Sequence, residues 1–463
     1  MKKFKDYNIW LILVLALLLR LVNLNQSFWL DEAAQVIESS RPLLNQFDIA
    51  ADFHPPLFHI LLHFWMYAGN SEIWVRILPV LLGIGSIYVT YKLATKLGGR
   101  TIGLYTALFL ALSPYHVWYS QETRPYMLFV FLSIASSLLL LSKKWSLYLV
   151  SVFLCLYSLY MAPFLIFSHF LYVYLFDKKS LRKFILSMGI ASLTFLPWLP
   201  RFLKQLTVGT GGFFTGWTEI VSIQTPKVIP LTFAKFIFGR GSIENNLIYT
   251  LVVLPTFLVF FLSFIKIWDK KEGKILLILF SIPFALVVFT SLFVPIAAPQ
   301  RLIFLLPIFY VVIAFYLKNI KSTFKYIAIV VIILTSLSGL IDYFANPYTQ
   351  REQWRQAVSK VEENVKGKSV SLFVFPTPFA PYLWYQKGRL EAIGIAPDFS
   401  LNDQDLIVLK DKITGKDRIF LFQYLTGLTD PQQRTRNFLK SSGMTESEIY
   451  DFPGVGFIFV YDQ

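Results

Sequence analysis

Long apolar runs recur through the first 345 residues of this 463-residue chain, and they limit what it can fold into. Eleven of them approach the ~17–25 apolar residues that a membrane-spanning helix needs. These runs cover residues 8–24, 78–97, 101–117, 126–142, 145–160, 162–176, 184–200, 247–267, 275–294, 302–317 and 326–344. Only 15% of all residues are charged, whereas soluble domains carry about 25%. The sequence therefore predicts an all-α polytopic membrane protein with about 11 transmembrane helices.

The net charge of +15 is unevenly placed along the chain. Residues 346–463 hold 14 Lys+Arg and 14 Asp+Glu, so the whole excess lies in the first 345 residues. It gathers between apolar runs, in segments 2–5, 92–100, 143–144, 178–183, 266–274 and 318–325. With eleven spans, all these segments fall on one side. Because basic loops stay cytoplasmic, we expect a cytoplasmic N-terminus, an extracytoplasmic C-terminus and no nucleic-acid partner.

The chain divides by composition into two predicted domains. Residues 1–345 form the transmembrane domain, with a first outer loop at 25–77 and a second at 201–246. The charge-balanced residues 346–463 are typical of a small extracytoplasmic α/β domain. In it we expect helices at 350–365 and 431–441 and strands at 369–375, 406–410, 418–424 and 456–461. The single cysteine, Cys155, excludes a disulfide framework.

Two adjacent carboxylates, Asp31 and Glu32, follow the aromatic sequence Phe28-Trp29-Leu30 in the first outer loop. Loss of water at a membrane surface makes a carboxylate a better base near neutral pH. The pair is therefore a candidate for the catalytic base. The alternative is that both acids only begin an interfacial helix, where negative charge suits the helix dipole.

Basic side chains that could hold a phosphate fall on the same predicted face. Arg124 follows Glu122 and precedes Tyr126 in the loop after the third run, and a guanidinium can bind phosphate through two parallel hydrogen bonds. The alternative is an interfacial Glu122–Arg124 ion pair, which contributes little. His54 could contact a phosphate or a metal, or lie at the surface without a ligand. Arg301 could bind phosphate or extend to the membrane interface.

A carboxylate pair and two arginines at an outer membrane surface suit one chemistry. A lipid-phosphate-linked sugar would present its phosphate to the arginines, while an acceptor hydroxyl would need a carboxylate base. Phosphate is the leaving group, so positive charge stabilises it as the bond breaks. The sequence holds no P-loop, no Gly-x-Ser-x-Gly and no His-Glu-x-x-His motif.

Several of these segments together resemble the GT-C glycosyltransferases. They are Arg20-Leu21 through Asp31-Glu32, His54-Pro55-Pro56-Leu57, Arg76-Ile77-Leu78-Pro79 with Gly83, Ser113-Pro114, Ser120-Gln121-Glu122-Thr123-Arg124, and Pro299-Gln300-Arg301 with Pro307. The resemblance covers about residues 10–310. Within the superfamily it is similar to the branch that contains protein O-mannosyltransferases and the aminoarabinose transferases of lipid A.

That resemblance implies an inverting glycosyltransferase with a polyprenyl-phosphate or dolichyl-phosphate sugar donor. Asp31 would be the base and Glu32 its neighbour, Arg124 would contact the donor phosphate with Arg301 and His54, and Glu122, Tyr126 and Arg20 would support them. Some relatives use a divalent metal and others do not, so a metal stays possible. The acceptor could be a lipid, a polysaccharide or a protein.

Two other functions fit parts of the sequence. A transporter or flippase of lipid-linked sugars would also carry charges near the membrane, but it should show repeated spans with polar midpoints. Here the polar groups gather at one face. A non-catalytic receptor or scaffold with an outer domain would not need an acid pair beside a phosphate site.

Overall fold

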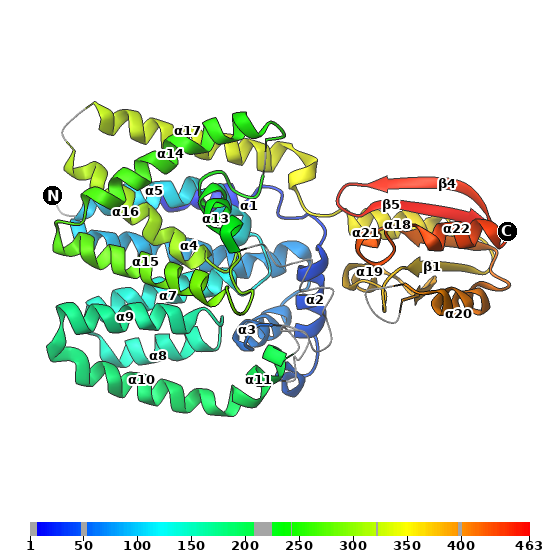
Figure 1. Cartoon of the computed structure of the whole chain (residues 1–463), viewed down its shortest axis with the longest axis horizontal. Helices are drawn as coiled ribbons and strands as arrows, with labels where there is room; N and C mark the ends of the chain where they lie inside the picture. The colour runs from blue at the N-terminus through cyan, green and yellow to red at the C-terminus, as the bar shows by residue number, and fades with distance from the viewer. Residues whose placement is uncertain (1–6, 48–52, 208–224, 242, 321–322, 397–400) are drawn as a thin grey trace. The chain divides into compact units, whose positions relative to one another are not determined.

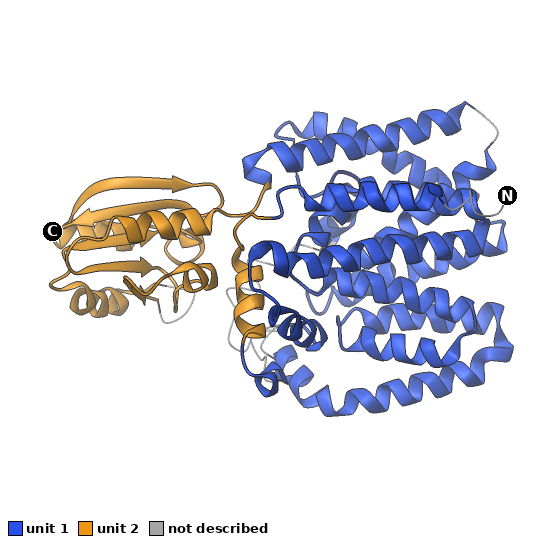
Figure 2. Ribbon diagram, turned by 180° about the vertical axis from the view of Figure 1, so that it is seen from behind, with its two compact units in different colours: residues 1–24, 41–210, 222–349 blue, residues 25–40, 211–221, 350–463 orange. Residues whose placement is uncertain are grey.

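The computed structural model describes residues 7–47, 53–207, 225–241, 243–320, 323–396 and 401–463. The chain forms two compact units, each built from separated segments (Figures 1 and 2). The first comprises residues 1–24, 41–210 and 222–349, and the second residues 25–40, 211–221 and 350–463. The basic segment 2–5 and residues 208–224 of the second predicted outer loop lie outside the described residues.

The first unit is a bundle of helices, and each predicted apolar run overlaps at least one of them (Figure 1). Its helices are α1 (Tyr7–Leu21), α3 (Leu57–Met66), α4 (Glu72–Gly98), α5 (Arg100–Leu112), α6 (Pro114–Ser120), α7 (Tyr126–Leu141), α8 (Trp145–Leu156), α9 (Ala162–Phe176), α10 (Leu181–Phe195), α11 (Leu199–Thr207), α13 (Thr225–Phe238), α14 (Asn246–Lys266), α15 (Lys271–Thr290), α16 (Leu306–Asn319) and α17 (Phe324–Ala345). The mostly helical architecture is as predicted.

Within the described residues, five helical segments are long and apolar enough to cross a membrane. They are Glu72–Gly98, Lys178–Thr207, Asn246–Lys266, Lys271–Thr290 and Phe324–Ala345. Other apolar helices, such as Tyr7–Leu21 and Tyr126–Leu141, are shorter. These helices indicate an integral membrane protein, while the count of about 11 spans stays a prediction.

The helices differ in which faces they expose. On α14, Leu247, Leu251, Leu254 and Leu258 are all more than 40% exposed, and their spacing places them on one face. A soluble protein rarely leaves so wide an apolar stripe in water, so this face suits lipid. By contrast, α16 is buried from Leu306 to Phe315 and packs against α4, α5, α14 and α15. It is therefore a core helix of the bundle.

The second unit carries a five-stranded sheet in its C-terminal part. Its strands are β1 (Ser369–Phe373), β2 (Glu391–Gly394), β3 (Arg418–Phe422), β4 (Thr445–Phe452) and β5 (Gly456–Asp462), in the order β2-β1-β3-β5-β4. Strands β2, β1 and β3 are parallel, and β5 runs antiparallel to β3 and β4. The unit's helices are α2 (Leu30–Ser39), α18 (Trp354–Glu363), α19 (Ala380–Tyr385), α20 (Asp403–Ile413), α21 (Thr426–Thr429) and α22 (Arg434–Ser441).

Both faces of this sheet are covered by an apolar core. Side chains alternate along a strand, so Phe420 and Phe422 of β3 enter one core while Ile419 and Leu421 enter the other. The first core is closed by α18 and α19, and the second by α20 and α22. The C-terminal part is therefore a three-layer α/β fold, in keeping with the predicted small α/β domain.

One strand prediction is wrong, because residues 406–410 belong to helix α20. Asn402 and Asp405 form a capping box that begins the helix, and Leu409 and Ile413 lie one turn apart in the second core. Helical spacing and capping outweigh the β-propensity of the apolar run. Strands β2 and β4 escaped prediction because they are the edges of the sheet, and edge strands carry charged, exposed residues.

Candidate active site

Arg20, near the end of α1, is fully buried and ties three helices together. Its guanidinium donates to the Leu110 and Ala111 carbonyls that end α5, both at 3.2 Å. It also contacts His116 Nδ1 at 2.8 Å and donates from Nε to Ser120 Oγ at 3.1 Å. Removing one member of such a buried network is costly. Arg20 therefore braces α5 and α6 behind the loop that carries Arg124.

The loop between α6 and α7 is fixed at its start by two hydrogen-bonded side chains. Gln121 donates to the Arg20 carbonyl at 2.9 Å and accepts from the Tyr343 hydroxyl at 2.6 Å. Glu122 accepts from Trp118 Nε1 at 2.9 Å. Both side chains are buried, so the backbone that presents Arg124 has little freedom.

Arg124, His54, Arg301 and Tyr126 form what we call the basic cluster. Arg124 Nη2 lies 3.1 Å from His54 Nδ1, and the rings of His54 and Tyr126 meet edge to face at 5.9 Å. Burial lowers the pKa of Arg301. Tyr126 opposes this effect, and the charge of the Arg124 guanidinium lowers the pKa further. The structure thus brings Arg124 and His54 into contact, and the charge of Arg124 acts on Arg301, the third side chain predicted to contact the donor phosphate.

The basic cluster is anchored from several elements. Arg301 donates to the Ile296 carbonyl at 3.1 Å. His54 is held by its own carbonyl, which accepts from Gln205 Nε2 of α11 at 3.4 Å. Only 8% of Arg124 and 7% of His54 is exposed. Two guanidinium groups whose charges act on each other favour an anion nearby, because an anion offsets their repulsion.

The predicted acids, Asp31 and Glu32, lie in the first turn of α2, in the second unit. Asp31 is half-buried, whereas Glu32 is fully buried. Glu32 Oε2 lies 4.0 Å from Arg351 Nε, and the Arg351 guanidinium also lies over the Trp29 ring. Glu32 is thus engaged with a buried arginine, and Asp31 is the more accessible carboxylate of the pair.

Two residues near these groups were not identified from the sequence. Glu352 is a buried carboxylate whose pKa the Asp31 charge raises, and nothing in the order of residues links positions 321 apart. Arg240 stacks on the Trp118 ring at 4.6 Å, beside Gly239, whose φ of +93° lies in a region largely reserved for glycine. The Gly239-Arg240-Gly241 sequence was the one available signal for Arg240.

No group of three His, Cys, Asp or Glu side chains that could hold a metal occurs among the described residues. The basic cluster offers nitrogen atoms with positive charge rather than carboxylates, a donor set that suits phosphate. Nothing in this part of the chain therefore assigns ligands to the divalent metal that the resemblance left possible.

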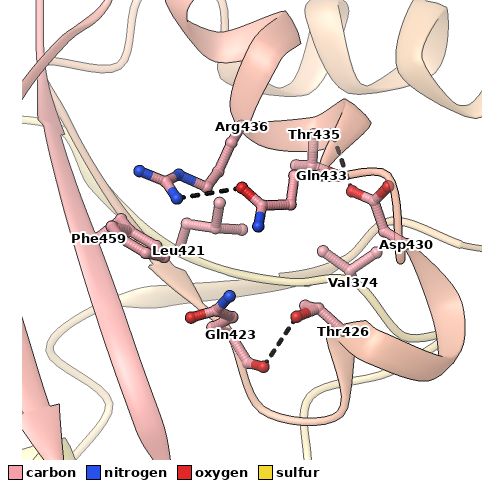
Figure 3. A pocket seen from close by; sticks show the side chains of 9 residues that line it. All are labelled: Val374, Leu421, Gln423, Thr426, Asp430, Gln433, Thr435, Arg436 and Phe459. Carbon is pink, nitrogen blue, oxygen red and sulfur yellow. Dashed lines mark hydrogen bonds between the residues drawn. The ribbon is translucent and has the colours of Figure 1, made fainter.

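A small cavity lies inside the C-terminal part of the second unit (Figure 3). It is lined by Val374, Leu421, Gln423, Thr426, Asp430, Gln433, Thr435, Arg436 and Phe459. The cavity has a volume of only ≈ 10 Å³, which is room for about one water. None of the predicted site residues lines it, and it is too small for a sugar ring.

Solved structures that share this fold include ArnT and an oligosaccharyltransferase. ArnT from Cupriavidus metallidurans bound to undecaprenyl phosphate matches with a TM-score of 0.57 at 11% identity, over 97% of this chain and 97% of that one. The oligosaccharyltransferase AglB from Archaeoglobus fulgidus, in complex with an inhibitory peptide and a dolichol-phosphate, matches with a TM-score of 0.55 at 12% identity, over 98% of this chain and 74% of that one.

The same archaeal enzyme in complex with Zn and sulfate gives a TM-score of 0.55 at 12% identity, over 97% of this chain and 72% of that one. No protein-family model and no curated protein sequence matches the chain. The identities are too low to carry a substrate across, but the matches extend over nearly the whole chain. This chain therefore has the fold of the GT-C glycosyltransferases that its sequence resembles.

Proposed function

We propose that this chain is an inverting glycosyltransferase that moves a sugar from a polyprenyl-phosphate or dolichyl-phosphate carrier to an acceptor hydroxyl outside the cytoplasm. The observation that carries the proposal is the basic cluster, in which Arg124 Nη2 lies 3.1 Å from His54 Nδ1 and the Arg124 charge acts on Arg301. Undecaprenyl phosphate in ArnT and dolichol-phosphate in AglB are ligands of the kind that such a cluster would bind.

The reaction would divide between the two groups of residues. The Asp31 carboxylate takes the proton of the acceptor hydroxyl, whose oxygen attacks the anomeric carbon of the sugar. The bond from that carbon to the phosphate oxygen breaks on the opposite face, and lipid phosphate leaves with the electron pair. Arg124 and Arg301 offset the charge that grows on the phosphate, and His54 orients Arg124. A lipid, a polysaccharide or a protein could supply the hydroxyl.

Purified protein in lipid vesicles, supplied with a labelled undecaprenyl-phosphate sugar and an extract of cell-envelope acceptors, tests this proposal. We expect a labelled glycoside by mass spectrometry, together with free undecaprenyl phosphate. Asp31→Asn should lower the rate ~10²–10⁴-fold, as loss of a general base does, while donor binding persists. Asp269→Asn makes the same chemical change at an exposed position and should leave the rate unchanged.

The rival function makes the opposite prediction. A flippase would move the labelled lipid between leaflets and form no new glycosidic bond. Label that crosses the bilayer unchanged, with no glycoside formed by the wild type, would replace the glycosyltransferase proposal by the transporter. Near-normal transfer by Asp31→Asn would keep the enzyme and remove Asp31 as its base.

A further inference from the structure

Residues 25–30, just before the predicted base, are held by the C-terminal part of their own unit. The backbone N–H of Arg351 donates to Gln26 Oε1 at 2.8 Å, and Ser27 Oγ donates to the Glu352 carbonyl. The backbone N–H of Phe28 donates to the Tyr385 hydroxyl at 2.7 Å. These contacts join positions more than 320 residues apart, so the C-terminal part fixes where this segment runs.

Apolar contacts reinforce the hydrogen bonds. Phe28 is fully buried and meets Trp384 edge to face at 5.8 Å. Leu30 packs against the core that Trp354 and Phe422 share, and helix α2 packs against α19. Burying a side chain the size of Phe or Leu stabilises by about 1.5–3 kcal/mol. The segment is therefore integrated into the α/β fold and is not a loose loop.

Glu352 lies at the centre of this attachment. Its carboxylate accepts from Trp354 Nε1 at 2.7 Å and from the Tyr424 hydroxyl at 2.9 Å. Its own backbone carbonyl accepts from Ser27 Oγ, four residues before Asp31. Gly454 covers it so closely that a Cβ there would lie 2.9 Å from the Glu352 Cα. Glu352 thus links the turn that carries Asp31 to the sheet.

The two carboxylates differ in their surroundings. Burial is the main reason why the pKa of Glu352 is raised to about 7. The Asp31 charge adds to this rise, and the hydrogen bonds from Trp354 and Tyr424 oppose it. Asp31 is half-buried and keeps more contact with water. The charged groups near this turn include Glu32 and Arg351, which pair with each other, and Arg355, which donates to the Asn25 carbonyl at 3.0 Å.

We propose that Glu352 is a positioning residue, whose side chain, held by Trp354 and Tyr424, fixes the segment before Asp31. The inference rests on the proposed function, because it takes Asp31 to be the group that accepts the proton. It adds that the C-terminal part of the chain holds this base in place. Ionisation of Glu352 as the pH rises leaves a charge in a buried site and weakens this support.

The test compares four variants of the full-length protein in vesicles, with initial rates taken against donor concentration from pH 5.5 to 8.5. Glu352→Ala removes the acceptor of the Trp354 and Tyr424 hydrogen bonds and should lower kcat ~10–100-fold, as loss of a supporting partner does, with the donor KM changed less than about 2-fold. Glu352→Gln keeps an acceptor and is always neutral. It should match the wild type at pH 6 and lack the fall in rate that the wild type shows above about pH 7.

Glu363→Gln, an exposed position at the end of α18, and Asp31→Asn complete the set. The Glu363 variant should behave as the wild type throughout. An unchanged kcat in Glu352→Ala, or a fall above pH 7 retained in Glu352→Gln, would overturn the positioning role. If Glu352→Ala does not fold, as judged by its melting temperature, the pH profile of Glu352→Gln alone decides.

Failure of the proposed function gives a different result. Normal transfer by Asp31→Asn, or no transfer by the wild type, removes the base on which Glu352 is proposed to act. An inactive Asp31→Asn with a fully active Glu352→Ala removes only the positioning role.

Discussion

At the scale of single residues, Arg124 has the most direct predicted role. Its side chain is almost fully buried beside His54 and Arg301, where a phosphate would be bound with little competition from water. We expect Arg124→Ala to lower kcat/KM for the donor about 10²-fold, the range seen when one charge-stabilising donor is removed. Lysine at position 124 should restore part of the rate. It supplies the positive charge, but it lacks the planar guanidinium that can donate two parallel hydrogen bonds to a phosphate. Initial rates against donor at saturating acceptor measure both.

Arg201→Ala is the matched control for this experiment. Arg201 is exposed and donates only to the Phe47 carbonyl among the contacts described, so its loss should leave donor use unchanged. If Arg124 instead serves only to hold Glu122, then Glu122→Gln should do equal harm with an unchanged donor KM. That outcome would take the phosphate role away from Arg124.

Glu352 also makes a residue-scale prediction about stability. An acid whose pKa is higher in the folded protein than its usual 4.5 binds more protons when folded, so the stability that it contributes falls as the pH rises from 4.5 to about 7. Glu352→Gln removes this dependence. Relative to the wild type, the variant should gain about 3 kcal/mol between pH 4.5 and 8. Melting temperatures in detergent measure the gain, and a difference that stays constant with pH would contradict it.

The sequence could indicate the basic cluster but not Glu352. Arg124, His54 and Arg301 each stand in a short polar segment next to an apolar run, and the charge pattern placed those segments on one face. Glu352 meets the segment before Asp31 through its own backbone carbonyl, which accepts from Ser27 Oγ. A hydrogen bond to a backbone carbonyl does not depend on which side chain that residue carries, so only the folded chain reveals this contact.

At the scale of elements, the turn between β4 and β5 tests how tightly the sheet holds Glu352. Gly454 and Gly456 both have positive φ, at +80 and +82, but only at Gly454 would a Cβ meet other atoms, 2.9 Å from the Glu352 Cα. Both Gly→Ala changes carry the ~1–2 kcal/mol backbone cost of this conformation. Gly454→Ala should lose a further ~1–3 kcal/mol through overpacking and should lower the transfer rate. Denaturation of both variants measures the difference, and equal losses would contradict the contact.

Helices and strands were predicted correctly where the apolar run was long, and less reliably where the run was short. The run at 326–344 is long enough to be read as a helix from composition alone, and it is α17. The four apolar residues Leu406–Leu409 fit a strand and a helix equally, and the capping box at Asn402 decides for the helix. Edge strand β4 consists of exposed and half-buried residues, several of them charged. Its sequence therefore gives no clear strand pattern, and only its pairing with β5 identifies it as a strand.

At the scale of the whole molecule, the unequal distribution of charge predicts the orientation in the membrane. The apolar face of α14 and the five long helices indicate that the chain crosses a bilayer. Neither feature shows which end of a helix faces the cytoplasm. Only the basic segments do so, through the preference of Lys and Arg loops for the cytoplasmic side. The assignment of Asp31 and Arg124 to the outer face depends on that argument.

We therefore expect the C-terminus to lie outside the cytoplasm. A fluorescent reporter that matures only in the cytoplasm should be dark when fused after Gln463, and a phosphatase active only outside should be active there. The same reporters fused after Lys270, in the basic segment between α14 and α15, should give the reverse result. Fluorescence after Gln463 would place the α/β fold, and with it Asp31 and Glu352, in the cytoplasm, where a lipid-linked donor exposed on the outer leaflet could not reach them.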